Sequence, residues 1–257
     1  MRFKLILSVR SDSYGNVLPV SYQYELSSCI YRKLRECPEL YRNWLGMNGF
    51  FPEYDMKYRL FSISNFYIPK IKVEQDRLFV LARRIQMWIS FLPERGTEEF
   101  VNTLLKEKTL LIGDRKSKVE LVVEDIVPCR PLVQKDTLDY LSLSPIVLTN
   151  LRGGKGYEYL SPASENYNEY LLQSILRKYE YFYGKPFEYD PGFKMEFLNE
   201  PKRKGIFIMK YTSDETKIIG YMYKFRLTLH PELHQLAYCT GIGEKINLGF
   251  GCIEELK

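Results

Sequence analysis

The sequence predicts an α+β protein made of two ferredoxin-like halves, residues 1–128 and residues 132–257, each an antiparallel sheet with helices on one face. Segments with alternating apolar and polar residues, which are typical of strands, are mixed with segments whose apolar residues recur every three or four positions, as in helices. In the first half these segments follow the order β-α-β-β-α-β. After the proline-containing segment at residues 127–131 a similar order returns, without a close sequence repeat between the halves.

The first half begins with an alternating segment at residues 3–9, which is expected to be a strand. A helix is expected over residues 22–35, because apolar side chains recur there every four positions from Tyr22 and so share one face. Pro38 ends that pattern. The remaining expected elements are strands at residues 59–66, 77–89, 109–112 and 118–127, and a helix at residues 93–106.

The second half shows a long helical pattern at residues 164–182, with Ser164 as its expected N-cap. A short helix at residues 231–239 leads directly into a glycine-rich loop at residues 241–251. The expected strands are residues 140–149, 194–199, 205–211 and 218–229.

The composition allows a full core, since 45% of the residues are hydrophobic and 27% are charged. No apolar run approaches the roughly 18 residues that a membrane helix requires. Residues 1–20 lack the apolar centre of a signal peptide. We therefore expect a cytoplasmic protein that does not associate with membranes.

The charge and the cysteine content narrow the chemistry further. The net charge of +5 and the pI of about 8.7 make the chain mildly basic, below the pI above about 9 that marks a dedicated nucleic-acid-binding domain. The five cysteines are an odd number and contain no C-x-x-C pair, which argues against a disulfide framework and a zinc ribbon. No metal and no cofactor is expected.

The glycine-rich loop carries the strongest local signal. Two Gly-x-Gly pairs bracket a short segment that contains Lys245 and Asn247. Glycine permits a close approach of backbone to ligand, and successive exposed N–H groups form an anion-binding nest. A phosphate chain suits that combination. A glycine-rich hairpin without a ligand is the alternative that the spacing leaves open.

The same loop resembles the C-terminal glycine-rich motif of the CRISPR-associated repeat endoribonucleases, the sixth Cas family of the RAMP superfamily. Met1-Arg-Phe-Lys-Leu5 and Leu18-Pro-Val-Ser-Tyr-Gln-Tyr24 are similar to the first strand and the start of the first helix of that family. Ser142-Leu-Ser-Pro-Ile-Val147 is similar to its central "SPI" segment. These segments come in the order of the family and span essentially the whole chain, so the resemblance implies tandem ferredoxin-like domains.

The resemblance also implies an activity. The family cuts CRISPR repeat RNA without a metal: the ribose 2′-hydroxyl attacks the adjacent phosphate and leaves a 2′,3′-cyclic phosphate and a 5′-hydroxyl. Tyr31 stands where the family has a helix tyrosine, and Lys57 or Arg59 stands where it has a lysine. The family histidine falls on Gly46, which has no side chain to transfer a proton.

Two functions follow from these residues. One is an endoribonuclease that uses Tyr31 with Lys57 or Arg59; the other is a catalytically weak or inactive paralogue that binds repeat or guide RNA as a subunit of an effector complex. Each of these residues could instead have a purely structural role. Tyr31 would then be an aromatic residue of the domain core, and Lys57 and Arg59 would be solvated cations at a strand edge. A ferredoxin-like protein that binds another phosphorylated ligand is a third, more remote function.

The expected partners are CRISPR repeat or guide RNA and, in the paralogue, other Cas effector subunits; the protein itself is expected to be a monomer or homodimer. His234 is expected to touch RNA or to face solvent, while His230 is expected at or before the N-cap of the short helix. Each cation alone is an ordinary surface charge, but together they suit an RNA backbone. The expected RNA contacts are Gly241, Gly243, Lys245, Asn247, Gly249, Gly251, Arg32, Arg152, Lys155 and the run Lys202, Arg203 and Lys204, which is expected in a loop.

Overall fold

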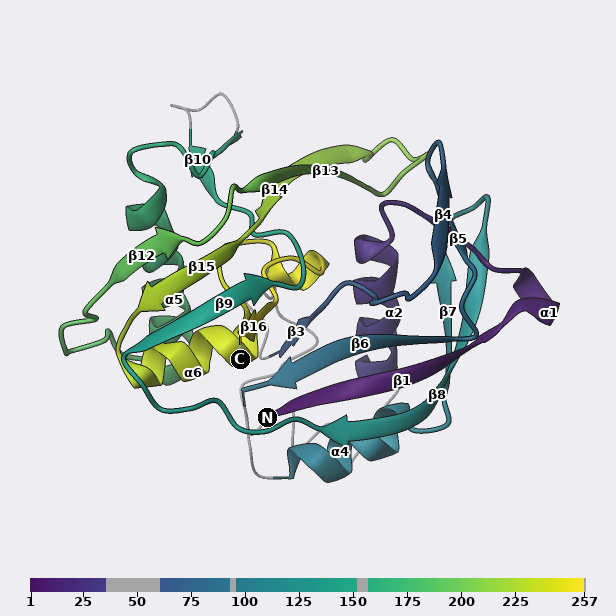
Figure 1. Cartoon of the computed structure of the whole chain (residues 1–257), viewed down its shortest axis with the longest axis horizontal. Helices are drawn as coiled ribbons and strands as arrows, with labels where there is room; N and C mark the ends of the chain where they lie inside the picture. The colour runs from purple at the N-terminus through teal and green to yellow at the C-terminus, as the bar shows by residue number, and fades with distance from the viewer. Residues whose placement is uncertain (36–60, 93–95, 152–156, 257) are drawn as a thin grey trace.

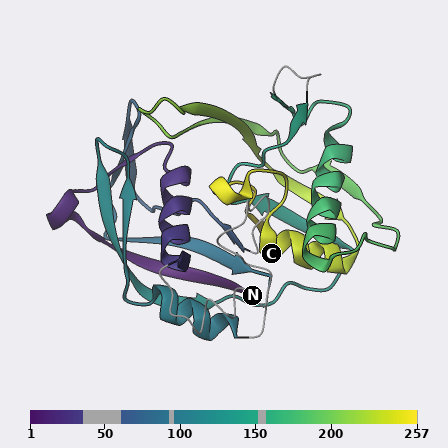
Figure 2. The ribbon, with the colours of Figure 1, turned by 180° about the vertical axis from the view of Figure 1, so that it is seen from behind.

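The computed structural model describes residues 1–35, 61–92, 96–151 and 157–256. The two halves of the chain form two antiparallel sheets that lie next to each other, with the main helices on the same side of both (Figure 1). Seen from behind, α2 and α5 stand in front of the sheets with the end of the chain between them (Figure 2). Among the helices that these ranges contain, none combines the length and the apolar character needed to cross a bilayer.

The first half contains a five-stranded sheet in the order β3-β6-β1-β8-β7. In a β-α-β-β-α-β unit the four strands follow one another in the chain as β1, β3, β6 and β8 here. Across the sheet they stand in the order second, third, first and fourth, and β7 is added at the edge next to β8. The bounds are β1 Arg2–Arg10, α2 Gln23–Arg35, β3 Phe61–Ile63, β6 Arg84–Phe91, α4 Thr97–Leu105, β7 Thr109–Gly113 and β8 Lys118–Pro128, with the short helix α1 at Ser11–Tyr14.

The second half repeats this topology. Its sheet has the order β12-β15-β9-β16, which is again second, third, first and fourth. The prediction of a tandem ferredoxin-like fold is therefore confirmed. In the sequence, the duplication is visible only in the order of the elements, because the two halves share no close sequence repeat. The bounds are β9 Thr137–Ser142, α5 Tyr167–Tyr183, β12 Lys194–Phe197, β15 Lys224–Thr228, α6 Pro231–Thr240, the short 3₁₀ turn η1 Ile246–Leu248 and β16 Ile253–Glu255. A two-stranded ribbon of β10 Thr149–Leu151 and β11 Tyr157–Tyr159 adds to it.

The predicted helix faces form the two cores. On α2, Tyr22, Leu26 and Ile30 are buried against the first sheet. On α5, Leu171 and Ile175 are buried against the second. Side chains at a spacing of three or four residues share a helix face, so burial of that face fixes each helix on its sheet.

Three predicted strands are wrong, because each is two strands that belong to different sheets. Residues 77–89 divide into β5 Arg77–Val80 and β6, residues 140–149 into β9 and β10, and residues 218–229 into β14 Thr216–Met222 and β15. Residues with high strand propensity, β-branched and aromatic, occur on both sides of each break, so the composition of the segment does not reveal the change of sheet. At one break, the Tyr223 oxygen accepts from the Ser142 amide at 3.0 Å and the Tyr223 amide donates to the Ser142 side-chain oxygen Oγ at 2.8 Å, so the hairpin ladder does not continue.

Each half carries an inserted hairpin between its second and third strands. In the first half this is β4 Ile71–Glu74 with β5, which also pairs with β2 Val17–Pro19; in the second half it is β13 Lys202–Ile208 with β14. The prediction of a loop for residues 202–204 is therefore wrong. The two hairpins reach toward each other across the top of the molecule (Figure 1).

The tips of these hairpins connect the two halves. Lys210 Nζ lies 2.6 Å from Asp76 Oδ2, and the Tyr211 hydroxyl donates to the same oxygen at 2.9 Å. Arg77 donates to the Tyr211 hydroxyl at 3.0 Å. These groups are partly exposed, so their contribution to stability is modest.

A second connection is buried. Arg2, at the start of β1, donates to the backbone oxygen of Tyr238 at 2.7 Å and to Glu254 Oε2 at 2.8 Å. Its guanidinium carbon also lies 3.5 Å from the centre of the Tyr238 ring. One side chain of the first half thus binds both α6 and β16 of the second half.

Candidate functional site

The glycine-rich loop lies between the two halves, where it packs against α2. Ser27 on α2 donates to the Asn247 oxygen at 2.7 Å. A Cβ on Gly249 would lie 2.9 Å from the Gln23 oxygen, and a Cβ on Gly251 would lie 2.1 Å from the Ile242 oxygen. Both glycines also have left-handed φ angles, of 89° and 74°. They are required because the backbone here approaches other backbone too closely for any side chain.

Most amides of this loop already have acceptors within the protein. The Ile242 amide donates to Gly251 O at 2.8 Å and the Glu244 amide to Val147 O at 2.7 Å. The amides of Gly243, Gly249 and Gly251 donate to Ser174 Oγ, Ile246 O and Pro145 O respectively. The expected nest of exposed amides is therefore wrong for these residues, since their hydrogen-bonding capacity is used to hold the loop in place.

Part of the loop stays near the surface. Gly241, Gly243, Gly249 and Gly251 are buried, whereas Lys245 and Asn247 are half-buried. The Lys245 ammonium lies 5.8 Å from the ring centre of Tyr157, at the edge of cation–π range. An RNA contact by the buried glycines would require movement of the packed loop, while a contact by Lys245 stays a prediction.

Sequence reasoning missed Lys178, which fixes the start of the loop. Its ammonium is fully buried on α5 and donates to Gly241 O at 2.6 Å. Burial lowers the pKa of Lys178 to about 7, and the nearby Glu244 carboxylate opposes that shift. A signal was present, because Lys178 follows Leu171 and Ile175 at the spacing of the inner face of α5.

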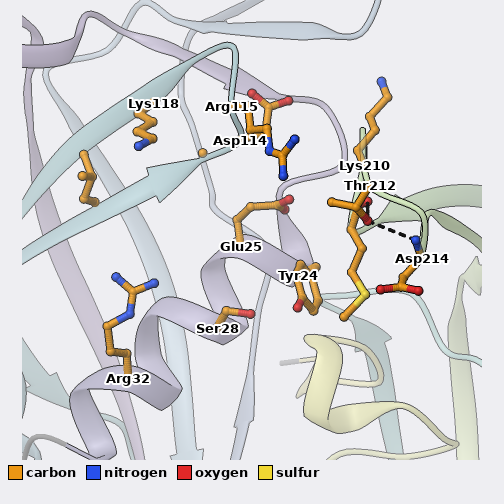
Figure 3. Close-up of a pocket in the computed structure, with 13 residues that line it drawn as sticks. Tyr24, Glu25, Ser28, Arg32, Asp114, Arg115, Lys118, Lys210, Thr212 and Asp214 are labelled. Carbon is orange, nitrogen blue, oxygen red and sulfur yellow. Dashed lines mark hydrogen bonds between the residues drawn. The ribbon is translucent and has the colours of Figure 1, made fainter.

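A pocket of about 540 Å³ opens beside α2, between the β7–β8 turn and the tip of the β13–β14 hairpin. We call it the α2 pocket. Figure 3 shows Glu25 in the middle of its lining, with Arg32 and Lys118 on the left, Arg115 above and Lys210 on the right. Within the described part of the chain its lining is Tyr24, Glu25, Ser28, Arg32, Leu111, Gly113, Asp114, Arg115, Lys118, Met209, Lys210, Thr212 and Asp214.

The charges of the α2 pocket are unevenly neutralised. Lys210 is paired with Asp76, and Asp114 lies 2.9 Å from Arg77. Arg32 and Lys118 are exposed, and neither has an ion pair among the residues that the structure describes. Two cations at the rim of the pocket are thus available to a polyanion such as an RNA backbone.

The other predicted residues are distributed as follows. Tyr31 is half-buried on α2 and packs against the first core, but it does not line the α2 pocket. Lys202, Arg203 and Lys204 are exposed on β13. Five residues of the sequence-based site lie outside the described residues, namely Gly46, Lys57, Arg59, Arg152 and Lys155.

The two histidines have structural roles. His230 is the N-cap of α6, as expected, and its Nδ1 accepts from the Glu232 amide at 3.3 Å. The expectation for His234 is wrong, because this side chain is buried, with Nδ1 3.0 Å from the Tyr140 hydroxyl and Nε2 3.1 Å from Asp136 O. Burial lowers the pKa of His234, so the neutral imidazole is favoured in the core.

Comparisons with known proteins agree on one family. The family model described as "CRISPR associated protein Cas6, C-terminal" matches residues 130–255. The "CRISPR-associated endoribonuclease Cas6 1" of Methanocaldococcus jannaschii is 26% identical over 260 residues, covering 97% of this chain and 91% of the relative. An endoribonuclease-like protein Cas6 of Pyrococcus furiosus is 27% identical, and the matched region covers 99% of this chain and 98% of that relative.

Solved structures show the same fold. A Cas6-related protein of Pyrococcus furiosus superposes with a TM-score of 0.81 at 24% identity, covering 100% of this chain and 98% of its own. A RAMP protein whose structure is described as binding different RNA substrates gives a TM-score of 0.79 at 22% identity, with 100% of both chains covered. The tandem arrangement of the two halves is common to all three molecules.

Proposed function

We propose that this chain belongs to the Cas6 family of CRISPR-associated RAMP proteins and is an endoribonuclease that cleaves CRISPR repeat RNA during guide-RNA maturation. The observation that carries the proposal is the relationship, over nearly its whole length, to proteins named Cas6 endoribonucleases. The proposed halves, residues 1–128 and 132–257, act as one RNA-binding unit, joined by Arg2 and by the hairpin tips.

The proposed reaction needs no metal. The 2′-hydroxyl loses its proton and its oxygen bonds to the adjacent phosphorus, the bond from phosphorus to the 5′ oxygen breaks, and that oxygen takes up a proton. Tyr31 orients the 2′-hydroxyl or acts as the acid, since an unperturbed phenol has a pKa of about 10 and is a weak base at neutral pH. Lys57 or Arg59 stabilises the negative charge that develops on the phosphate oxygens.

The proposed RNA path runs over the exposed cations. Arg32 and Lys118 at the rim of the α2 pocket and the run of three cations on β13 supply the positive charge. Lys245 is half-buried in the glycine-rich loop, which contacts α2 of the first half through Asn247. Arg152 and Lys155 are further proposed contacts. Binding through such contacts weakens steeply with salt, because each one releases condensed counterions.

A second function is favoured by Gly46. The chain has no histidine at that position, and one of its relatives carries the name endoribonuclease-like. In this alternative the protein binds repeat or guide RNA tightly without cutting it, and serves as a subunit of an effector complex.

One experiment separates the two functions. The protein is incubated in EDTA with end-labelled repeat RNA from the same genome, and the products are resolved at single-nucleotide resolution. The endoribonuclease gives one cut with a 2′,3′-cyclic phosphate, which Tyr31→Phe and Lys57→Ala each slow by about tenfold or more. Tight binding without a cut supports the RNA-binding paralogue, and absence of binding refutes both.

A further inference from the structure

Glu25 has one carboxylate oxygen without a hydrogen-bond donor in the α2 pocket. Its Oε2 atom is buried, and no donor of the described residues reaches it. Burial raises the pKa of Glu25 to about 7, because the charged form is poorly solvated there, and the neighbouring Asp114 carboxylate adds to the shift. A buried polar atom without a partner destabilises a protein, so a ligand that donates to this oxygen would bind favourably in the pocket.

The other two acids of the pocket differ from Glu25. Asp114 accepts from Arg77 Nη1 at 3.0 Å and from the Lys116 and Ser117 amides at 2.9 and 3.0 Å. Asp214 is exposed to water. Asp114 Oδ2 is, like Glu25 Oε2, buried without a hydrogen bond, but it lies 2.9 Å from Arg77 Nη2 in an ion pair. Among the described residues, Glu25 Oε2 has neither a donor nor a cation beside it, which distinguishes it from the buried oxygen of Asp114.

We propose that the α2 pocket recognises a guanine base of the bound RNA, with the two carboxylate oxygens of Glu25 accepting hydrogen bonds from N1–H and N2–H₂ of that base. This proposal rests on the proposed function, because it assigns a base-specific contact to the same RNA. A carboxylate is an acceptor only, and it offers two parallel acceptor sites. Among the four bases, guanine alone presents two adjacent N–H donors on its Watson–Crick edge.

The surroundings fit a single splayed-out nucleotide. Tyr24 and Met209 line the pocket next to Glu25 and offer an aromatic ring and an apolar chain to the flat face of a base. Arg32 lies about two helical turns from Glu25 on the same side of α2, where it can meet a flanking phosphate. Sequence recognition of RNA commonly uses unstacked bases held in this manner.

The test measures binding rather than cleavage, so that it holds for an active enzyme and for a binding paralogue. Repeat RNAs carrying inosine in place of each single guanine, which removes the N2 amino group, are titrated against the wild-type protein and Glu25→Gln. Wild type should lose about tenfold in affinity at one position. Glu25→Gln should bind unmodified RNA about tenfold more weakly and should not distinguish guanine from inosine at that position.

Asp214→Asn is the matched control, because it removes one negative charge from the same pocket by the same change of acid to amide. It should retain the full penalty for inosine. A melting temperature of Glu25→Gln at or above that of wild type at pH 8 shows that the variant is folded. If wild type binds the repeat but every inosine acts equally on wild type and Glu25→Gln, the guanine site is refuted; if wild type does not bind the repeat, the proposed function itself fails.

Discussion

Lys178 brings an ammonium group into the interior of the second half, where it donates a hydrogen bond to Gly241 O at 2.6 Å. The energetic cost of burial appears as a pKa lowered to about 7 from the usual 10.5 of a lysine. The unfolded chain therefore binds a proton that the folded protein releases between these two pH values. The free energy of unfolding should rise with pH across that window.

We predict that Lys178→Met removes this rise, which should amount to about 1.4 kcal/mol per pH unit between pH 7.5 and pH 9.5. Urea unfolding at several pH values measures it as the difference between wild type and variant. Lys185→Met is the control, because Lys185 is exposed after α5. Equal pH slopes in wild type and Lys178→Met would contradict the assignment of a depressed pKa to this residue.

At the scale of elements, the glycine-rich loop is a packed connection between α6 and β16. Its glycines let the backbone pass within contact distance of α2 and of the loop itself. The sequence indicates glycine-dependent geometry correctly, but it does not distinguish a backbone that approaches a phosphate from one that approaches another backbone. That choice depends on where the acceptors of residues 145–147 lie in the folded protein.

Gly251→Ala should destabilise the protein by about 3 kcal/mol or more, since the new Cβ meets Ile242 O at 2.1 Å and the φ angle is left-handed. Gly15→Ala should cost about 1 kcal/mol, because Gly15 has a similar φ of 85° but no atom within 4 Å of the added Cβ. Thermal unfolding of both variants compares the two directly. Similar losses would mean that the loop yields easily and is not tightly packed.

The β13–β14 hairpin presents three exposed cations on one strand. We expect the three side chains together, and not any one of them alone, to determine how much this hairpin contributes to RNA binding. We predict that the triple change of Lys202, Arg203 and Lys204 to Ala weakens binding of repeat RNA. It should also reduce the slope of log K against log salt by about 2, at about 0.7 for each lost phosphate contact.

The control for this variant is the double change of Lys106 and Lys108 to Ala, which removes exposed cations that follow α4. Its salt slope should equal that of wild type. A triple variant with an unchanged slope would remove β13 from the proposed RNA path.

At the scale of the whole molecule, two of the connections between the ferredoxin-like units differ in burial, one at Arg2 and one at the hairpin tips. Arg2 is 2% exposed and satisfies acceptors on α6 and β16, whereas the hairpin tips form their ion pairs close to water. The buried connection should dominate, because removing one partner leaves the other groups buried without hydrogen bonds.

Arg2→Met is expected to lower the free energy of unfolding by about 3–5 kcal/mol. Tyr211→Phe, which removes only the hydroxyl from the hairpin tips, should change it by less than about 1 kcal/mol. Chemical unfolding followed by tyrosine fluorescence reports both. A larger effect for Tyr211→Phe would show that the hairpins, and not the first strand, hold the halves together.

The sequence alone indicated the types of most elements, the faces of α2 and α5 that pack on the sheets, and the resemblance to the Cas6 family. These depend on periodicity within one segment and on short motifs, which are local properties of the chain. It also placed His230 correctly as a cap, because proline at the next position favours a helix start.

The tertiary structure was needed to show which strands join which sheet, which groups the glycine-rich loop contacts, and which groups surround Glu25 in the α2 pocket. Tyr223, Lys178 and Glu25 show why. Each acquires its role from groups far away in sequence, namely Ser142, Gly241 and the β7–β8 turn. The burial of a side chain and its hydrogen-bond partners are set only when such distant segments pack together. A local pattern of residues therefore does not predict them.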